Sequence, residues 1–145
     1  MPEVSIRIAL MALLALAAPA FAGGIAATLY KNPGCGCCGE HAKYLRAHGI
    51  EVTEVETAQL ARLRRALGVP DHLAGCHLIR IGPYVFEGHL PAVSIAQVLR
   101  DRPPIRGLSV PGMPPGSPGM TGIKQGPLHV YHITDETPPR LYASY

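Results

Sequence analysis

Three cysteines lie within four residues of this chain, in the sequence Cys-Gly-Cys-Cys at residues 35–38. An apolar run precedes this cluster and a helical pattern follows it, which limits the folds that the chain can adopt. The run at residues 24–30 is short and mostly apolar, and the Lys-Asn-Pro-Gly after it is typical of a tight loop. Beyond the cluster, apolar residues recur at helical spacing as far as Gly49, a typical helix stop. The pattern predicts a strand, a loop and a helix, with the thiols on the loop and the first helical turn.

Residues 51–102 continue as alternating strands and helices. Thr57 is a good N-cap for a helix that Gly68 ends, and Pro91 suits the first position of a later helix. Gly82-Pro83 separates two short apolar runs, which predicts a hairpin. The elements expected here cover residues 51–56, 57–67, 76–81, 84–89 and 91–100. The resulting order, βαβαββα with thiols on the first strand-to-helix loop, indicates an α/β protein with a thioredoxin-like core at residues 23–102.

The chain changes character after this core. Residues 103–127 are rich in Gly and Pro, so we expect an irregular flap without helix or strand that covers the thiol site. Residues 128–134 and 140–144 are expected to pair as a C-terminal hairpin packed on the domain. We see no internal repeat.

Residues 1–22 are predicted to be a signal peptide. A polar start is followed by an apolar run, and Ala20-Phe21-Ala22 supplies the small-x-small cleavage pattern. The run is about 15 residues, short for a bilayer span of about 20. We therefore expect a periplasmic protein with no membrane association after cleavage. A retained N-terminal anchor is the alternative.

Charge and cysteine usage narrow the function. The net charge of +3 is small, and without a Lys/Arg-rich block we expect no nucleic-acid partner. All four cysteines follow the signal peptide, and in an oxidising compartment cysteines usually form structural disulfides. Three cysteines within four residues argue against that use, because a bridge between Cys35 and Cys38 closes almost no loop. The clustering indicates chemistry.

Cys35 and Cys38 have the C-x-x-C spacing that brings two sulfur atoms together at a helix N-terminus. The helix dipole and free amides there favour thiolate, so we expect both thiols to be more acidic than free cysteine. Cys37 adds a third sulfur, which suits Cu(I) because this ion prefers thiolate and thioether ligands. We expect Cu(I) as the bound metal, with room for more than one ion.

Two other interpretations stay open. The first is an enzyme, a thiol or copper oxidoreductase in which Cys35 attacks and Cys38 resolves, although a third thiol invites scrambled pairing. The second is an interaction module with an inert zinc or disulfide. A single tetrahedral zinc more usually takes two separated C-x-x-C pairs.

The predicted hairpin and the first helix carry further candidate metal ligands. Cys76 is expected to begin the third strand close to the thiol loop and complete a four-thiolate site, or else to be a small buried hydrophobe. Cys76 and His77 point to opposite faces of a strand, so they do not easily reach one metal. His89 is the better imidazole candidate, with a solvent-exposed histidine as the alternative. His41, three residues after Cys38, is within reach of the cluster, but a surface helix carries histidine routinely.

Met113 and Met120 lie in the Gly/Pro-rich segment. A methionine in a polar, exposed stretch has no core to fill, so its thioether becomes a candidate soft ligand. The alternative is a linker whose methionines pack over a thiol-rich cleft.

Four motifs together resemble a known family. Residues 29–38, 75–77, 87–89 and 110–120 are similar, in this order, to the periplasmic metal-binding family called CopG-like in copper resistance, which is distinct from the DNA-binding repressors of that name. The resemblance implies a thioredoxin-like fold, a copper-binding C-x-C-C cluster and a place in copper tolerance, by binding Cu(I) or by interconverting copper redox states. The family usually carries an aromatic residue where this chain has His41, which adds a candidate ligand.

The combined expectation is a periplasmic copper-binding protein that sequesters Cu(I) or passes it to a transporter or chaperone by ligand exchange. Cys35, Cys37, Cys38 and Cys76 are the expected ligands, with Met113, Met120 and His89 as outer ligands.

Overall fold

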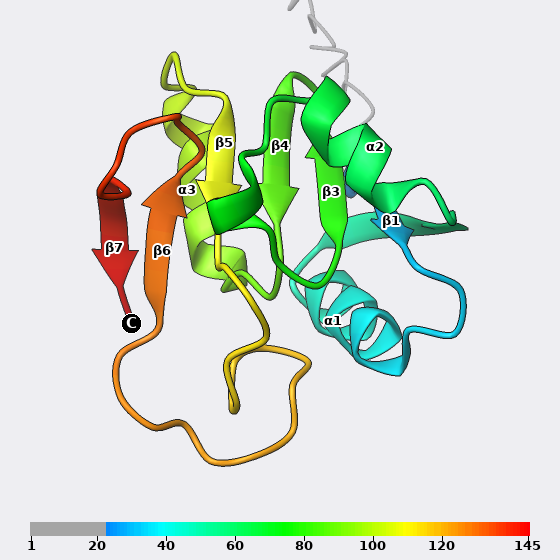
Figure 1. The fold of residues 1–145 in the computed structure, drawn as a ribbon. Helices are drawn as coiled ribbons and strands as arrows, with labels where there is room; N and C mark the ends of the chain where they lie inside the picture. The colour runs from blue at the N-terminus through cyan, green and yellow to red at the C-terminus, as the bar shows by residue number, and fades with distance from the viewer. Residues whose placement is uncertain (1–22) are drawn as a thin grey trace, which may run out of the picture.

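The computed structural model describes residues 23–145, so the predicted signal peptide lies outside the described residues. The chain forms one mixed seven-stranded sheet in the order β2-β1-β3-β4-β5-β6-β7 (Figure 1). The strands are β1 (Ile25–Lys31), β2 (Ile50–Glu56), β3 (Leu78–Ile81), β4 (Tyr84–Glu87), β5 (Gly107–Ser109), β6 (His129–His132) and β7 (Leu141–Ser144). The helices are α1 (Gly36–Ala47), α2 (Leu60–Ala66), the short 3-10 turn η1 (Asp71–Leu73) and α3 (Ala92–Asp101).

The predicted α/β class and the order βαβαββα are confirmed, with shifted boundaries. Strand β3 begins at Leu78, not at Cys76, because the chain bends at Cys76 before it joins the sheet. Thr57 is not the N-cap of α2, since Gln59 takes that position; Thr57 Oγ1 instead accepts the amide of Gln59 in the turn before the helix. The thioredoxin-like assignment stays a prediction.

The expectation that residues 103–127 contain no strand is wrong. Strand β5 pairs parallel with β4 and antiparallel with β6, and its Leu108 is fully buried. Three residues are too few to show a period of two, so only pairing on both sides reveals this strand. The C-terminal hairpin is confirmed, since β6 and β7 pair antiparallel.

Each face of the sheet carries its own helices. Helices α1 and α3 pack on one face, which includes Leu29, Ile79 and Phe86, whereas α2 covers the face of Leu78 and Val85. Successive residues of β3 thus face opposite layers, both apolar, as a central strand requires. Figure 1 shows α3 behind the sheet and α2 in front of β3.

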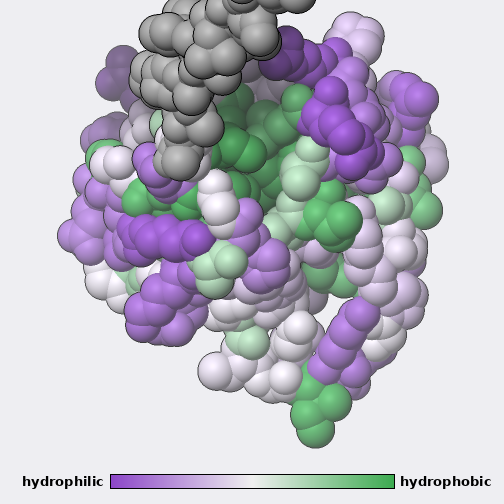
Figure 2. All heavy atoms as spheres, turned by 180° about the vertical axis from the view of Figure 1, so that it is seen from behind, coloured by the Kyte–Doolittle hydropathy of each residue, from purple (hydrophilic) through white to green (hydrophobic). Residues whose placement is uncertain are grey.

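The rear surface carries an apolar hollow. Figure 2 shows hydrophobic side chains gathering there, surrounded by hydrophilic ones. A pocket of about 690 Å³ lies between the β3–β4 turn and α3, lined among others by Ile81, Tyr84 and Leu99. Within residues 23–145, no helix has the length and apolar character that crossing a bilayer demands.

Candidate metal centre

The thiols gather where β1 runs into α1. The loop turns sharply after Asn32, whose carbonyl accepts the amide of Cys35, and Gly34 takes a left-handed conformation with φ 73°. Cys35 is the N-cap residue of α1, and Cys37 and Cys38 lie in the first turn. The predicted position of the cluster on the loop and first helical turn is therefore correct.

Cys76 reaches this turn from the segment before β3. Its Sγ lies 3.2 Å from Cys37 Sγ, 3.3 Å from Cys38 Sγ and 3.5 Å from Cys35 Sγ. Cys35 and Cys38 are joined in a disulfide, and Cys37 and Cys76 are free thiols. The structure thus brings the four predicted thiol ligands together, in a form in which two of them are oxidised.

Burial raises the pKa of Cys76 to about 12, with further contributions from its hydrogen bond to Cys37 and from the charge of Cys37. The Cys76 thiol therefore keeps its proton at neutral pH. The expected acidity of Cys35 and Cys38 stays a prediction, because disulfide sulfurs do not titrate.

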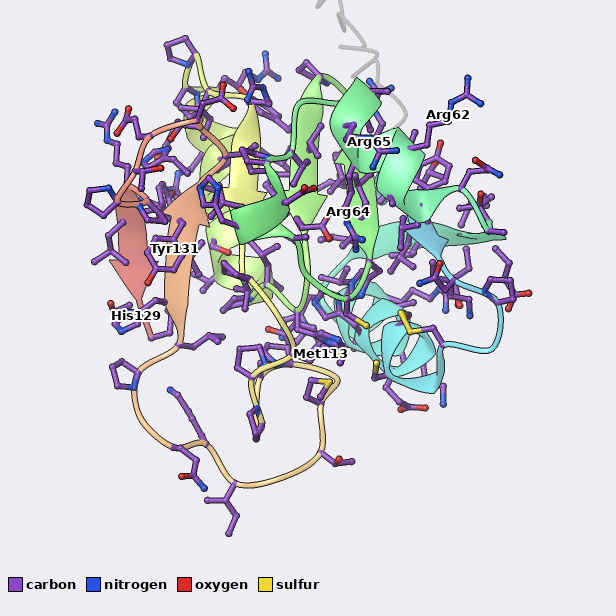
Figure 3. The ribbon with its side chains drawn as sticks, in the orientation of Figure 1. Arg62, Arg64, Arg65, Met113, His129 and Tyr131 are labelled. Carbon is purple, nitrogen blue, oxygen red and sulfur yellow. A yellow bond between two sulfur atoms is a disulfide. The ribbon has the colours of Figure 1, made fainter. Side chains whose placement is uncertain are left out.

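A pocket of about 410 Å³ opens beside three of the four cysteines, with Cys35, Cys37, Cys76 and Met113 among its lining residues. Met113 is 56% exposed, so its thioether stands at the solvent side of the pocket. Figure 3 shows Met113 below the sheet, near the sulfur atoms of α1. Met120 is half-buried elsewhere in the flap and does not line this pocket.

Arg64 and Glu87 hold the backbone before Cys76 in place. Glu87 is fully buried, and its Oε1 accepts hydrogen bonds from Arg64 Nε at 2.8 Å and from the Gly75 amide at 2.9 Å. Arg64 also donates to the Gly75 carbonyl at 2.6 Å. Burial raises the pKa of Glu87, while the Arg64 guanidinium acts against this shift. Figure 3 shows Arg64 pointing inward from α2, unlike its neighbour Arg65.

A second cluster lies beside the thiols and consists of His41, His77 and His89, all fully buried. His41 Nδ1 lies 2.7 Å from His77 Nε2, and His41 Nε2 lies 2.9 Å from the Leu90 carbonyl oxygen. The predicted ligand His89 therefore lies with these two rings and outside the group of four thiols.

Burial keeps these imidazoles neutral. Desolvation lowers the pKa of His41 to about 4, and it lowers the pKa of His77 well below the ordinary value. The pKa of His89 is lowered for the same reason. Two ring nitrogens, His77 Nδ1 and His89 Nε2, have no hydrogen-bond partner. Leaving a buried polar atom unpaired costs about 1–3 kcal/mol, so these atoms call for a partner.

The flap, residues 103–127, packs against the histidines. It was expected to cover the thiols, but only Gly112 and Met113 of the flap line the pocket beside them. His89 Nδ1 donates to the Pro118 carbonyl at 2.8 Å. Gly119 has φ 79° and lies so near α1 that an added Cβ would be 2.5 Å from the His41 amide nitrogen. Gly112 anchors the start of the flap, because its amide donates to the Ala74 carbonyl at 2.9 Å.

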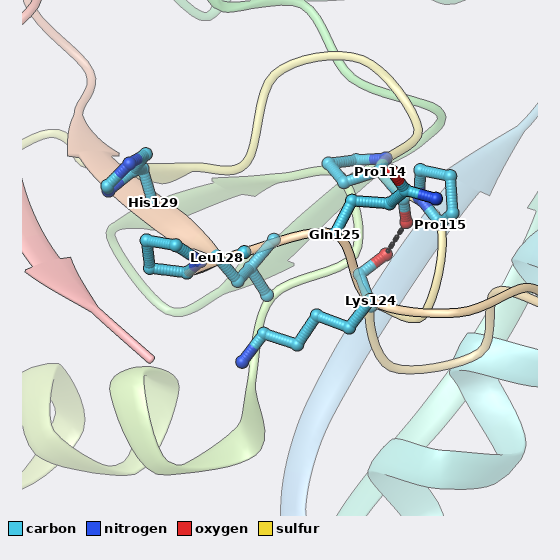
Figure 4. A pocket seen from close by; sticks show the side chains of 9 residues that line it. Pro114, Pro115, Lys124, Gln125, Leu128 and His129 are labelled. Atoms are coloured by element: carbon cyan, nitrogen blue, oxygen red, sulfur yellow. Dashed lines mark hydrogen bonds between the residues drawn. The ribbon is translucent and has the colours of Figure 1, made fainter.

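Another pocket lies on the far side of the flap. It has a volume of about 320 Å³ and is lined by Pro114, Lys124, Leu128 and His129 among others (Figure 4). None of its lining residues is a cysteine, so it is separate from the thiol site.

Sequence reasoning missed Arg64 and the grouping of the histidines. Arg64 sits among several arginines on α2, and nothing in the pattern distinguishes it from Arg62 or Arg65. The sequence did carry one signal for the histidine cluster. Adjacent residues such as Cys76 and His77 point in opposite directions, and the structure places their side chains in different clusters. That His77 contacts His41 and His89 becomes visible only when α1 is packed against the connection between β4 and α3.

Known proteins resemble this chain in sequence and structure. Residues 73–120 match a family described as "Protein of unknown function, DUF411". Two solved structures, named "Copper resistance protein copG- Form 1" and "Form 2", share 36% sequence identity and cover 84% of this chain and 98% of theirs. Their TM-scores are 0.75 and 0.76. No curated protein matches this chain.

Proposed function

This chain belongs to the CopG family of copper resistance proteins, and from that premise we propose that its thiol cluster binds Cu(I) and sequesters or transfers it in metal tolerance. The observation that carries the proposal is the convergence of Cys76 Sγ on three other sulfurs, all within 3.5 Å of it. Sulfur ligands about 2.3 Å from one tetrahedral ion lie about 3.7 Å apart. After reduction of the disulfide, small side-chain rotations bring the four sulfurs to metal-binding separation.

The donor set favours copper over harder ions. Thiolates are soft ligands and select Cu(I), and a thiolate sulfur also bridges two ions, so the cluster accommodates more than one. Met113 lines the same pocket and supplies a thioether at its solvent side. Among the three outer ligands expected from the sequence, Met113 is therefore the one that this pocket supports, ahead of Met120 and His89.

The setting of the function is part of the proposal. We place the protein in the periplasm after removal of residues 1–22. Copper enters or leaves through the pocket beside Cys37, and the exposed Met113 starts ligand exchange with a transporter or a chaperone. A half-buried thiol cluster with one exposed thioether suits such exchange, because the ion need not pass through water.

Anaerobic titration of the fully reduced protein with Cu(I), against a competing chelator, tests the proposal. Cys37→Ser removes one of the four sulfurs and is expected to lower both affinity and stoichiometry. Met113→Leu is expected to weaken affinity less, and Met120→Leu serves as its matched control because Met120 lies outside the pocket. Unchanged affinity and stoichiometry in Cys37→Ser would refute Cys37 as a ligand.

A second candidate function is a thiol or copper oxidoreductase. It is favoured by the Cys35–Cys38 disulfide, which lies 3.3 Å from the free thiol of Cys76 at its Cys38 end. Reduction of this disulfide takes up two electrons and two protons, and oxidation of two Cu(I) ions to Cu(II) supplies the electrons. Turnover that survives Cys37→Ser and is lost in Cys35→Ser would favour this candidate over copper storage.

A further inference from the structure

The hydrogen bonds of the buried histidines determine which ring nitrogens carry protons. A carbonyl oxygen only accepts, so His41 donates from Nε2 to Leu90 and His89 donates from Nδ1 to Pro118. The other nitrogen of each neutral ring is then a bare lone pair. His41 Nδ1 consequently accepts the proton of His77 Nε2, at 2.7 Å.

This chain of donors leaves two lone pairs without a partner. With its proton on Nε2, His77 has a bare Nδ1, and His89 has a bare Nε2. These are the two buried histidine nitrogens that lack any hydrogen bond. Both rings are fully buried, and their centroids lie 4.8 Å apart. The lone pairs therefore belong to one enclosed cluster.

The geometry points to a second copper site, separate from the thiols, in which His77 and His89 bind one Cu(I) ion through these bare nitrogens and His41 positions His77. A ring nitrogen of each histidine lies within 4.8 Å of a ring nitrogen of the other two. Two imidazole nitrogens on opposite sides of one ion, each about 2.0 Å from it, are about 4 Å apart. The 4.8 Å between the ring centroids of His77 and His89 is of the same order as this separation.

The surroundings match those of metal-bound imidazoles. A ligating histidine usually donates its other N–H to a fixed acceptor, which sets the tautomer and the ring orientation. His89 has the Pro118 carbonyl for this purpose, and His77 has His41. His41 is itself held by the Leu90 carbonyl. The acceptors are in place without a metal, so binding requires no rearrangement of protons.

The neutral, buried surroundings of the histidine site favour Cu(I) over Cu(II). Both ligands are neutral, and burying a single positive charge among neutral groups costs less than burying two. Imidazole suits copper as well as zinc, and a two-ligand site suits Cu(I). The assignment of copper, rather than the existence of the site, rests on the proposed function.

The test uses the full chain with its free thiols chemically blocked, so that they cannot bind metal. In the oxidised protein, alkylation of Cys37 and Cys76 with iodoacetamide in urea, where Cys76 is no longer buried, followed by refolding, leaves none of the four cysteines as a free thiol. The probes are Cu(I) and the diamagnetic ion Ag(I), added to protein with ¹⁵N-labelled histidine rings. We expect one bound equivalent and a large shift of the His77 Nδ1 and His89 Nε2 resonances.

Variants separate the positioning role of His41 from a structural one. His41→Phe fills the space but accepts no proton from His77, and is expected to weaken binding at least about tenfold. His41→Gln restores one acceptor and one donor, and is expected to recover most of the affinity. His72→Phe, at an exposed histidine outside the cluster, is the matched control.

Two outcomes would overturn the site: unchanged histidine resonances in the alkylated protein, or equal binding by His41→Phe and His41→Gln. The resonances are measured without mutation, so a variant that fails to fold does not obscure the result. If the reduced wild-type protein shows no thiolate-to-copper absorption while the histidine resonances still shift, the proposed thiolate function fails and the histidine site stands.

Discussion

The Sγ atoms of Cys37 and Cys76, which are 39 residues apart in the chain, lie 3.2 Å from each other. The contact joins the first turn of α1 to the segment before β3, and it involves the two cysteines that remain free when Cys35 and Cys38 are oxidised. The number of free thiols in the cluster therefore depends on the oxidation state of Cys35 and Cys38.

Reduction is expected to switch on the four-thiolate site. The oxidised protein offers two free thiols at the cluster and the reduced protein offers four, so thiolate-to-copper absorption in the ultraviolet should be much stronger after reduction. Anaerobic Cu(I) titration of the two forms, with free thiols counted in each, measures this. Equal absorption per protein in both forms would contradict it.

Arg64→Met is expected to destabilise the protein and displace Cys76. It leaves the buried Glu87 carboxylate without its cation and removes a donor to the Gly75 carbonyl, at a cost of ~3 kcal/mol. Urea unfolding and Cu(I) titration of the reduced protein measure the two effects. Arg65→Met, at an exposed position on the same helix, should have nearly the unfolding free energy and Cu(I) affinity of the wild type. If the two variants have the same stability and affinity, Arg64 does not position Cys76.

Gly119→Ala is expected to lift the flap from α1. The residue has φ 79°, and its Cβ would lie 2.5 Å from the His41 amide nitrogen, so the change should cost about 1–3 kcal/mol. Thermal unfolding and amide exchange of the flap measure the loss. Gly36→Ala is the control, because its Cβ meets nothing within 4 Å and alanine favours the helix. A Gly119→Ala protein as stable as Gly36→Ala would exclude close packing of the flap.

Glu54 is expected to give a pH-dependent contribution to stability. Its hydrogen bond to Lys31 is the main cause that lowers its pKa below the ordinary 4.5, with Arg46 adding to the effect. A lowered carboxyl pKa stabilises the folded state above 4.5, and the gain is lost as pH falls through the folded-state pKa. Glu54→Gln should therefore cost about 0.5 kcal/mol at neutral pH and progressively less in acid.

Urea unfolding of wild type and Glu54→Gln over a pH series measures this difference. Glu136→Gln, at an exposed carboxylate in the loop between β6 and β7, is the control. If the difference in unfolding free energy between wild type and Glu54→Gln stays constant as the pH falls, the contact with Lys31 does not act through charge.

Local patterns predicted much of the fold. The strand, loop and helix around residues 35–38, the hairpin at Gly82-Pro83 and the C-terminal pair β6–β7 all follow from short-range signals. Strand β5 did not, because its stability comes from two neighbouring strands and not from its own three residues.

The position of three thiols at the start of a helix that follows a strand could be predicted from the sequence alone, because strand, loop and helix are contiguous in the chain. The sequence also indicated that Cys76 and His77 face different ways. The sequence left open whether Cys76 joins the other thiols, as expected, or is a small buried hydrophobe, and nothing in it indicated that His77 meets His41 and His89. The fold settles both points, since these contacts join segments brought together by sheet pairing and helix packing. Arg64 acquires its role in the same way, by lying over the one buried carboxylate of the described residues.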